Sequence, residues 1–259
     1  MKEKKVYQCE GSIDGIFTAI YDAWDSRYGH DNIRIEVMDE GRTDLNFEFF
    51  TEYIKVNTDM EKVEKVARSI KKKISAEAYD MVFYGACSNS YDRGDIIYRF
   101  LIEGFRIGKQ IVECLSNDVV INLFNLNRSV GNERHHYLGF LRFAQTKSNI
   151  LYAKVNPKND VIRLIAPHFA DRIGNEDFII YDETRRTAII HRTGYPWVYT
   201  VIKDMDVEQL LMEERLEDDY EELWRTFFTS IAIKERINPN LQRNNLPKRF
   251  RGNMTEFTK

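Results

Sequence analysis

The hydrophobic pattern of this chain changes its period twice along the sequence. Residues 58–136 carry apolar side chains at the three- and four-residue spacing of amphipathic helices, and residues 206–236 return to that spacing. Between them, residues 138–202 alternate between apolar and polar side chains and contain turn signals. A run of helices, a run of strands and a further helix are typical of an α+β protein, in which helices pack on an antiparallel sheet.

The alternating part predicts a sheet with the element order β-β-α-β-β-β. Turns such as TKSN and RTGYP favour antiparallel hairpins. The strand candidates are 139–145, 149–155, 177–182, 187–192 and 196–202, and the helix is NDVIRLIAPHFADRI. The pattern that follows, from Tyr220 to Ile231, predicts a helix that buries an aromatic face. We predict one compact domain over 1–259; the alternative is a mainly helical part, 1–136, and a part with the sheet, the C-terminal helix and a basic tail, 137–259.

The N-terminal part opens with short strand candidates, KVYQCE, RIEV (34–37) and EYIKV (52–56). Ser12 is expected to cap the helix that follows it, and Thr58 with Glu61 forms the pattern of a capping box. Gly104 and Gly108 lie four residues apart in the clearest helical pattern. Each glycine costs about 1 kcal/mol inside a helix, so we expect both where another helix packs closely.

Composition excludes several classes of protein. No apolar run reaches the roughly 18 residues that a membrane span needs, and no apolar stretch follows the basic start, so no signal peptide is expected. The three cysteines have no C-x-x-C spacing, which argues against a disulfide framework, a zinc site or an iron–sulfur cluster and favours the reducing cytoplasm. Phosphate-loop, Rossmann, zincin and nucleophile-elbow motifs are absent.

Charge reverses sharply near the C-terminal end. Residues 204–222 hold ten acids and one base, a net charge of −9, whereas residues 234–259 hold seven bases and two acids, a net charge of +5. The basic tail either folds back on the acidic segment or binds phosphates, and its prolines predict an extended backbone. Arginine forks suit phosphates and amides suit base edges. The candidate nucleic-acid contacts are Arg142, Arg236, Gln242, Arg243, Lys248, Arg249 and Arg251.

Glu133, His135 and His136 form the densest group of titratable residues. Their spacing is wrong for metal ligands on one helix face, since such ligands lie three or four residues apart, so we predict no metal site. Acid–base roles for Glu133, His135 and Asp160 are the catalytic alternative. His168, within an apolar helix, is expected to be a satisfied core histidine.

Several stretches together resemble one bacterial family. They are YQCEGSIDGIFTAIYDAW, LIEGFRIG, VGNERHHYLGFLRF, LYAKVNPKNDVIRLIAPHFADR and WRTFFTSIAIKERINPNLQRNNLPKRFRGNMTEF. The chain resembles the conserved domain described as a probable DNA metabolism protein, a domain of unknown function. The resemblance implies a radical-SAM protein that modifies or repairs DNA as a neighbour, and in some members fusion to a uracil-DNA-glycosylase-like domain. His136 stands where an arginine is expected in the family.

Three hypotheses follow from the residues and the resemblance together. The first is a DNA-binding accessory protein for a radical-SAM modification or repair system, with no independent enzymatic activity and no cofactor; RNA is an alternative ligand. The partners expected are DNA, the radical-SAM protein and a uracil-DNA-glycosylase-like protein, with no membrane. The second is a nucleic-acid-processing enzyme, glycosylase- or nuclease-like, that uses Glu133, His135 and Asp160. The third is an assembly factor whose charged segments contact only proteins.

Overall fold

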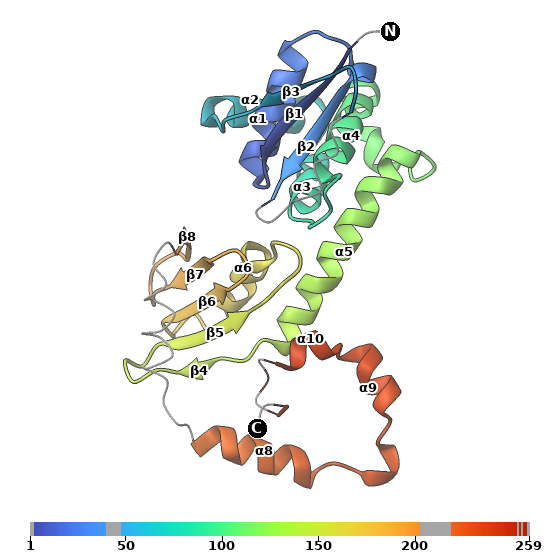
Figure 1. The fold of residues 1–259 in the computed structure, drawn as a ribbon. Helices are drawn as coiled ribbons and strands as arrows, with labels where there is room; N and C mark the ends of the chain where they lie inside the picture. Colours follow the sequence, from blue (N-terminus) through green and yellow to red (C-terminus); the bar gives the residue numbers. More distant parts are fainter. Residues whose placement is uncertain (1–2, 40–47, 203–218, 253, 255, 258–259) are drawn as a thin grey trace. The chain divides into compact units, whose positions relative to one another are not determined.

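The chain forms two compact units, Met1–Gly131 and Asn132–Lys259. The structure is a computed structural model and describes residues 3–39, 48–202, 219–252, 254 and 256–257. The boundary falls inside helix α5 (Asp118–Phe140), earlier than the alternative division after residue 136 (Figure 1). Helices occur with both parallel and antiparallel strands, which confirms the α+β class. None of the helices in the described part is long and apolar enough to cross a membrane.

Unit 1 is built on a three-stranded parallel sheet in the order β2-β1-β3. The three strands, β1 (Lys4–Glu10), β2 (Ile33–Met38) and β3 (Thr51–Lys55), coincide with the stretches predicted from sequence. Parallel neighbours need a crossover between them, and α1 (Ile13–Asp25) supplies it between β1 and β2. The remaining helices are α2 (Met60–Lys73), α3 (Ala76–Ala86) and α4 (Arg93–Ile107), followed by a 3-10 helix, Gly108–Glu113.

Two helix caps of unit 1 test the sequence predictions directly. Ser12 caps α1 as predicted, because its hydroxyl accepts a hydrogen bond from Gly15 N at 3.0 Å. The cap of α2 is Asp59, one residue later than predicted, and its carboxylate accepts from Glu61 N at 2.9 Å. Thr58 instead donates to Glu10 Oε1 at 2.8 Å and ties the start of α2 to the end of β1.

The two glycines of α4 have different roles. A Cβ at Gly104 would lie 2.8 Å from Ile74 Cδ1, so close packing explains this glycine as predicted. Gly108 has a φ of +79° and ends the helix, and a Cβ there would meet nothing within 4 Å. The packing explanation is therefore wrong for Gly108, where the left-handed backbone conformation requires glycine.

Unit 2 contains a five-stranded sheet in the order β4-β5-β6-β7-β8. Its elements are β4 (Ala144–Gln145), β5 (Leu151–Val155), α6 (Ile162–Arg172), β6 (Phe178–Asp182), β7 (Thr187–His191) and β8 (Val198–Val201). The element order is as predicted, but β5 and β6 pair in parallel, so the sheet is mixed. The physical reason is the intervening α6, which packs on β6 and β7 and carries the chain back across the sheet. The first strand is shorter than predicted because α5 continues to Phe140.

The last part of unit 2 differs most from the sequence expectations. It forms α8 (Asp219–Ser230), a 3-10 turn (Lys234–Arg236), α9 (Pro239–Asn245) and α10 (Lys248–Arg251). The basic tail is therefore helical where an extended backbone was predicted, because Asn238 caps α9 by accepting from Leu241 N at 3.0 Å and Pro239 occupies the first helical position. The aromatic face of α8 is not buried, since Trp224 and Phe227 are 42% and 52% exposed.

Gly94, at the start of α4, provides a test of the packing between this helix and β2. A Cβ there would lie 2.9 Å from Ile35 Cγ2 and 3.3 Å from the Ile35 carbonyl oxygen. Gly94→Ala should lower the free energy of unfolding by about 1–3 kcal/mol, as overpacking does, measured by urea denaturation. Gly131→Ala is the control, since its Cβ would meet nothing within 4 Å; it should be neutral or stabilising by up to about 1 kcal/mol. Equal effects would contradict the packing argument.

Candidate nucleic-acid interface

The seven predicted nucleic-acid contacts fall into two sets in the structure. Arg142, Arg249 and Arg251 make contacts within unit 2, although Arg249 is itself exposed. The other four are exposed as well and lack such contacts: Arg236, Gln242, Arg243 and Lys248. None of these four forms an ion pair or a side-chain hydrogen bond with another residue that the structure describes. The distinction divides the basic segment into a part that holds it in place and a part that is open to a ligand.

Arg249 and Phe250 hold α10 against α5. The Arg249 guanidinium lies 3.0 Å from Glu133 Oε1, and the Phe250 ring is buried at 5% exposure. The ring centroid of Phe250 lies 5.0 Å from those of His136 and Tyr137, and 5.8 Å from that of Phe140. A buried aromatic ring among three others is an anchor, so α10 is fixed by packing as well as by charge.

Glu256 ties the following segment to two further elements. Arg142, just after α5, donates to Glu256 Oε1 at 3.0 Å, and Trp224 Nε1 of α8 donates to the other oxygen at 3.3 Å. Arg251 donates to the Leu246 carbonyl at 3.1 Å and lies over the ring of Phe257. These contacts close the basic segment on itself. Among the described residues, Glu133 is the acidic partner of the bases of this segment, and Glu256, within the segment, pairs with Arg142. Residues 204–218, where most of the acidic run falls, lie outside the described residues.

Glu133 is buried and its carboxylate is fully used. It accepts from Lys158 N at 3.0 Å, from Asn159 N at 2.8 Å and from Asn159 Nδ2 at 2.7 Å, in addition to the ion pair with Arg249. Four donors on two oxygens occupy the lone pairs of the carboxylate and leave none facing solvent. The geometry therefore favours a structural role for Glu133 over proton transfer or metal binding.

The same loop is held from its other side by Arg185. Its guanidinium donates to the Pro157 carbonyl at 3.1 Å and to Asp182 Oδ2 at 3.1 Å. Asp182 also accepts from Thr184 N at 2.9 Å, and burial raises the pKa of its carboxyl group, although Arg185 opposes that shift. Glu133 takes the N–H groups of the loop and Arg185 takes its carbonyls, so residues 157–159 are fixed by two opposite charges.

The remaining titratable candidates do not converge. His135 is exposed, and its ring centroid lies 6.5 Å from that of His136. Asp160 Oδ1 and His168 Nε2 are each buried without a hydrogen-bond partner in the described part of the chain, so His168 is not the satisfied core histidine that was expected. Within the described residues, no three His, Cys, Asp or Glu side chains gather closely enough to hold a metal ion. The catalytic roles of Glu133, His135 and Asp160 stay a prediction.

Sequence reasoning predicted the helix that forms α2, with lysines on its polar face, but gave this second basic feature no binding role. This helix carries six bases and two acids, a net charge of +4, and its last turn contains Lys71, Lys72 and Lys73. Three lysines in a last turn stabilise a helix through its dipole, which makes such a run easy to overlook. Lys65 is the residue that indicates a further role, because it lies outside the last turn and near the aromatic ring of Tyr21.

Glu133→Ala should act on stability. It leaves the buried Asn159 N–H, the partly buried Lys158 N–H and the half-exposed Arg249 guanidinium without their partner, so the free energy of unfolding of unit 2 should fall by about 1–3 kcal/mol. Hydrogen exchange at Lys158 and Asn159 should accelerate. His135→Ala, on the same helix but exposed, is the control and should leave both measurements unchanged. An unchanged stability in Glu133→Ala would contradict the anchoring role.

His136 should make unit 2 less stable in mild acid. Burial chiefly, with Arg249 and His135, lowers the pKa of His136. An unfolded histidine titrates near pH 6.5, so below about that value the unfolded state binds more protons and stability falls until the pH passes the folded pKa. The melting temperature should therefore drop between about pH 7.5 and 5.5. His136→Gln should reduce that drop more than His135→Gln does, since the second variant removes only one of the lesser causes of the lowered pKa. An identical pH dependence in both variants would exclude this origin.

Comparison with known proteins gives a family without an assigned activity. A family model described as a domain of unknown function, DUF4130, matches residues 91–256, which is more than half of the chain. The matched range contains all seven predicted nucleic-acid contacts and the network around Glu133. No curated protein matches the chain. The expectation of a domain family of unknown function is confirmed.

Proposed function

Since the chain belongs to the DUF4130 family of domains of unknown function, we propose its function from the geometry: it binds nucleic acid, DNA foremost, as an accessory protein without bond-breaking chemistry of its own. The observation that carries the proposal is the division of the basic segment. Three arginines and a buried phenylalanine anchor it through internal contacts. The residues that are open to a ligand are Arg236, Gln242, Arg243 and Lys248.

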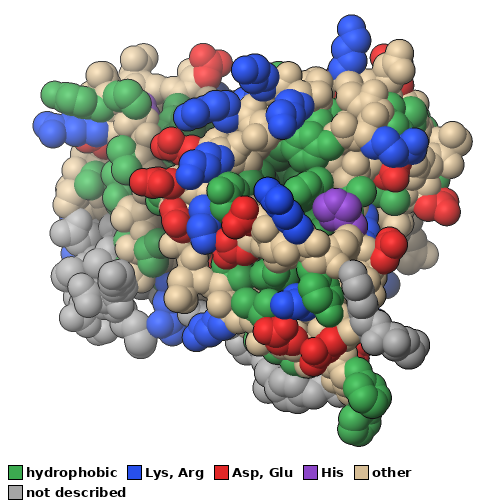
Figure 2. All heavy atoms as spheres, turned by 90° about the horizontal axis from the view of Figure 1, so that it is seen from above, with side chains coloured by type: hydrophobic (Ala, Val, Ile, Leu, Met, Phe, Trp, Pro, Cys, Tyr) green, Lys and Arg blue, Asp and Glu red, His purple; other side chains and the backbone are tan. Residues whose placement is uncertain are grey.

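The composition of the open part suits a nucleic-acid strand. Arginine forks bind phosphate oxygens through two parallel hydrogen bonds, and a glutamine amide can bond to base edges. The preceding helix adds exposed rings, Trp224, Phe227 and Phe228, on which bases can stack. Figure 2 shows one face of the molecule, on which Lys and Arg side chains lie among hydrophobic ones.

The biological setting of the proposal comes from the motif resemblance. On that resemblance we propose that the chain works in DNA metabolism in the cytoplasm, with a radical-SAM protein that would carry out the modification or repair step and with a uracil-DNA-glycosylase-like protein. The accessory role agrees with the saturated carboxylate of Glu133, because the residue best placed in sequence for acid–base work has no free lone pair.

The assembly hypothesis has an observation of its own. Leu223, Phe227 and Ile231 of α8 and the turn after it are 61%, 52% and 57% exposed, and an apolar row of this kind also suits a protein partner. Salt dependence separates the two functions, because phosphate contacts release counterions and apolar protein contacts do not.

Replacing exposed bases should weaken DNA binding without loss of stability. Arg236→Gln with Arg243→Gln should lower affinity for labelled single- and double-stranded DNA. Each phosphate that is no longer neutralised should reduce the slope of log K against log salt by roughly 0.7–0.9. Fluorescence anisotropy at about 50 and 200 mM salt measures both the affinity and the slope. The melting temperature should not change, since both residues are exposed.

Arg249→Gln provides the control, since it makes the same substitution once, at an anchoring residue, and should lower the melting temperature. If wild-type protein shows no salt-sensitive binding to DNA or RNA, the proposal is overturned and the assembly function takes its place. Tighter binding of RNA than of DNA would retain nucleic-acid binding and overturn the choice of DNA.

A further inference from the structure

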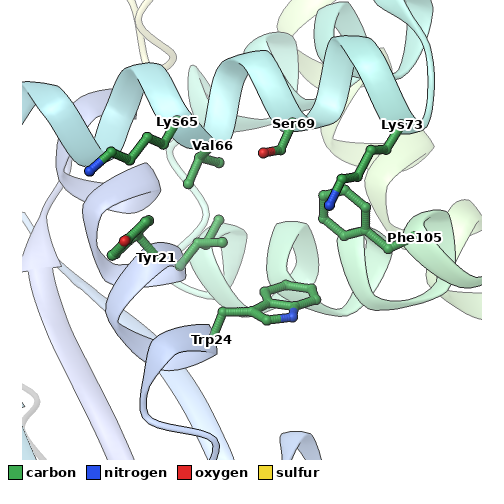
Figure 3. Close-up of a pocket in the computed structure, with 8 residues that line it drawn as sticks. Tyr21, Trp24, Lys65, Val66, Ser69, Lys73 and Phe105 are labelled. Carbon is green, nitrogen blue, oxygen red and sulfur yellow. The ribbon is translucent and has the colours of Figure 1, made fainter.

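Unit 1 contains an aromatic pocket in which α1, α2 and α4 meet. Its volume is about 340 Å³, within the range of small-molecule sites. The lining residues are Ile20, Tyr21 and Trp24 of α1, Lys65, Val66, Ser69 and Lys73 of α2, and Phe105 of α4. Figure 3 shows the rings of Tyr21 and Trp24 on one side of the pocket, opposite Val66 and Ser69, with Lys65 and Lys73 toward its two ends.

The aromatic wall is rigid before any ligand arrives. The Trp24 ring makes edge-to-face contacts with His30 at 4.8 Å, with Tyr98 at 5.4 Å and with Phe105 at 5.3 Å between centroids. Tyr98 is fully buried and its hydroxyl lies 2.8 Å from His30 Nδ1, so this hydrogen bond fixes two of the rings that Trp24 contacts. Because these three contacts hold the Trp24 ring in one orientation, stacking on a flat ligand costs it little conformational entropy.

The charges at the pocket are positive. No carboxylate is among the lining residues. Lys73 forms no ion pair with any residue that the structure describes and lies 6.0 Å from the Phe105 ring centroid. Lys65 lies 5.6 Å from the Tyr21 ring centroid, and its distance to the exposed Glu61 carboxylate is 3.9 Å, a weak surface pair. Eight residues separate the two lysines, about 12 Å along a helix axis.

These features specify a ligand with a flat aromatic body and anionic groups beside it. A purely apolar ligand would leave the lysines unused, and a simple anion would leave the rings unused. We propose that this pocket binds the base of a nucleotide, stacked on the Tyr21–Trp24 wall, while Lys65 and Lys73 contact its phosphates. We take the ligand to be an unpaired nucleotide within a strand, and this choice rests on the proposed function. The pocket itself lies in unit 1, whereas Arg236 and Arg243 lie in unit 2.

The test compares two double variants of the same helix. Lys65→Gln with Lys73→Gln removes the two charges of the pocket, whereas Arg68→Gln with Lys72→Gln removes two charges from a shallow hollow on α2 outside it. All four side chains are exposed, so both proteins should fold. The probes are a labelled single strand, the same strand with abasic positions, and free nucleoside monophosphate as a competitor.

The pocket variant should bind the normal strand about tenfold more weakly than the control variant does. Removing the bases should weaken wild-type binding by about 5- to 100-fold, the range for loss of base stacking, and should abolish the difference between the variants. Equal weakening in both variants, or no effect of the abasic positions, overturns the pocket assignment.

Two further outcomes separate the pocket from the proposed function. The free monophosphate could bind with the same affinity as the strand and require Lys65 and Lys73. That result supports the pocket and assigns the free nucleotide as its ligand. Strand binding that disappears in Arg236→Gln with Arg243→Gln but is equal in the two α2 variants supports the proposed function and overturns the pocket. Absence of all binding to strand and monophosphate overturns both.

Discussion

The buried carboxylate of Glu133 is the interaction on which the arrangement of unit 2 depends. One side chain of α5 satisfies two backbone N–H groups and an amide of the loop after β5, and it also pairs with Arg249 of α10. The loop, the helix and the basic segment are therefore fixed relative to one another by a single charged group. Such a group is costly to bury unless each oxygen is paired, and here each is. Arg185 completes the arrangement from the other side of the loop.

This use of charge bears on the proposed binding of nucleic acid by the basic segment. A cationic segment with no anchor would lose conformational entropy when it bound, and that loss would weaken the complex. Here Phe250 and three arginines make the internal contacts, so the outward-facing residues are attached to an ordered support. Unit 1 combines rigid rings and lysines in a different way, in a pocket rather than on a surface. Both places join positive charge to aromatic rings.

Sequence periodicity predicted most elements of the fold, because apolar spacing reports local structure. The three strands of unit 1, the Ser12 cap and the order of elements in unit 2 follow from it. The parallel pairing of β5 with β6 did not, since strand direction depends on how α6 returns the chain across the sheet. The sequence grouped Arg142 and six polar residues of the basic segment by type, but Arg249 and Arg243 differ only in what lies beside them in space. The pocket joins residues 20 to 105, and no local pattern indicates such a meeting.

The order of strands in unit 1 has a consequence for how the chain emerges from the ribosome. The central strand β1 comes first, yet it pairs with β2 and with β3, whose partner for Lys5 is Glu52, about fifty residues later. At translation rates of roughly 5–20 residues per second, β1 waits on the order of a few seconds for β2 and longer for β3, so the edge that pairs with β3 stays unpaired for the longer interval. Its apolar Val6, Tyr7 and Cys9, all buried in the finished sheet, are exposed for that interval. Nascent chains of this protein should therefore depend on chaperones that bind at the ribosome more than its final fold suggests.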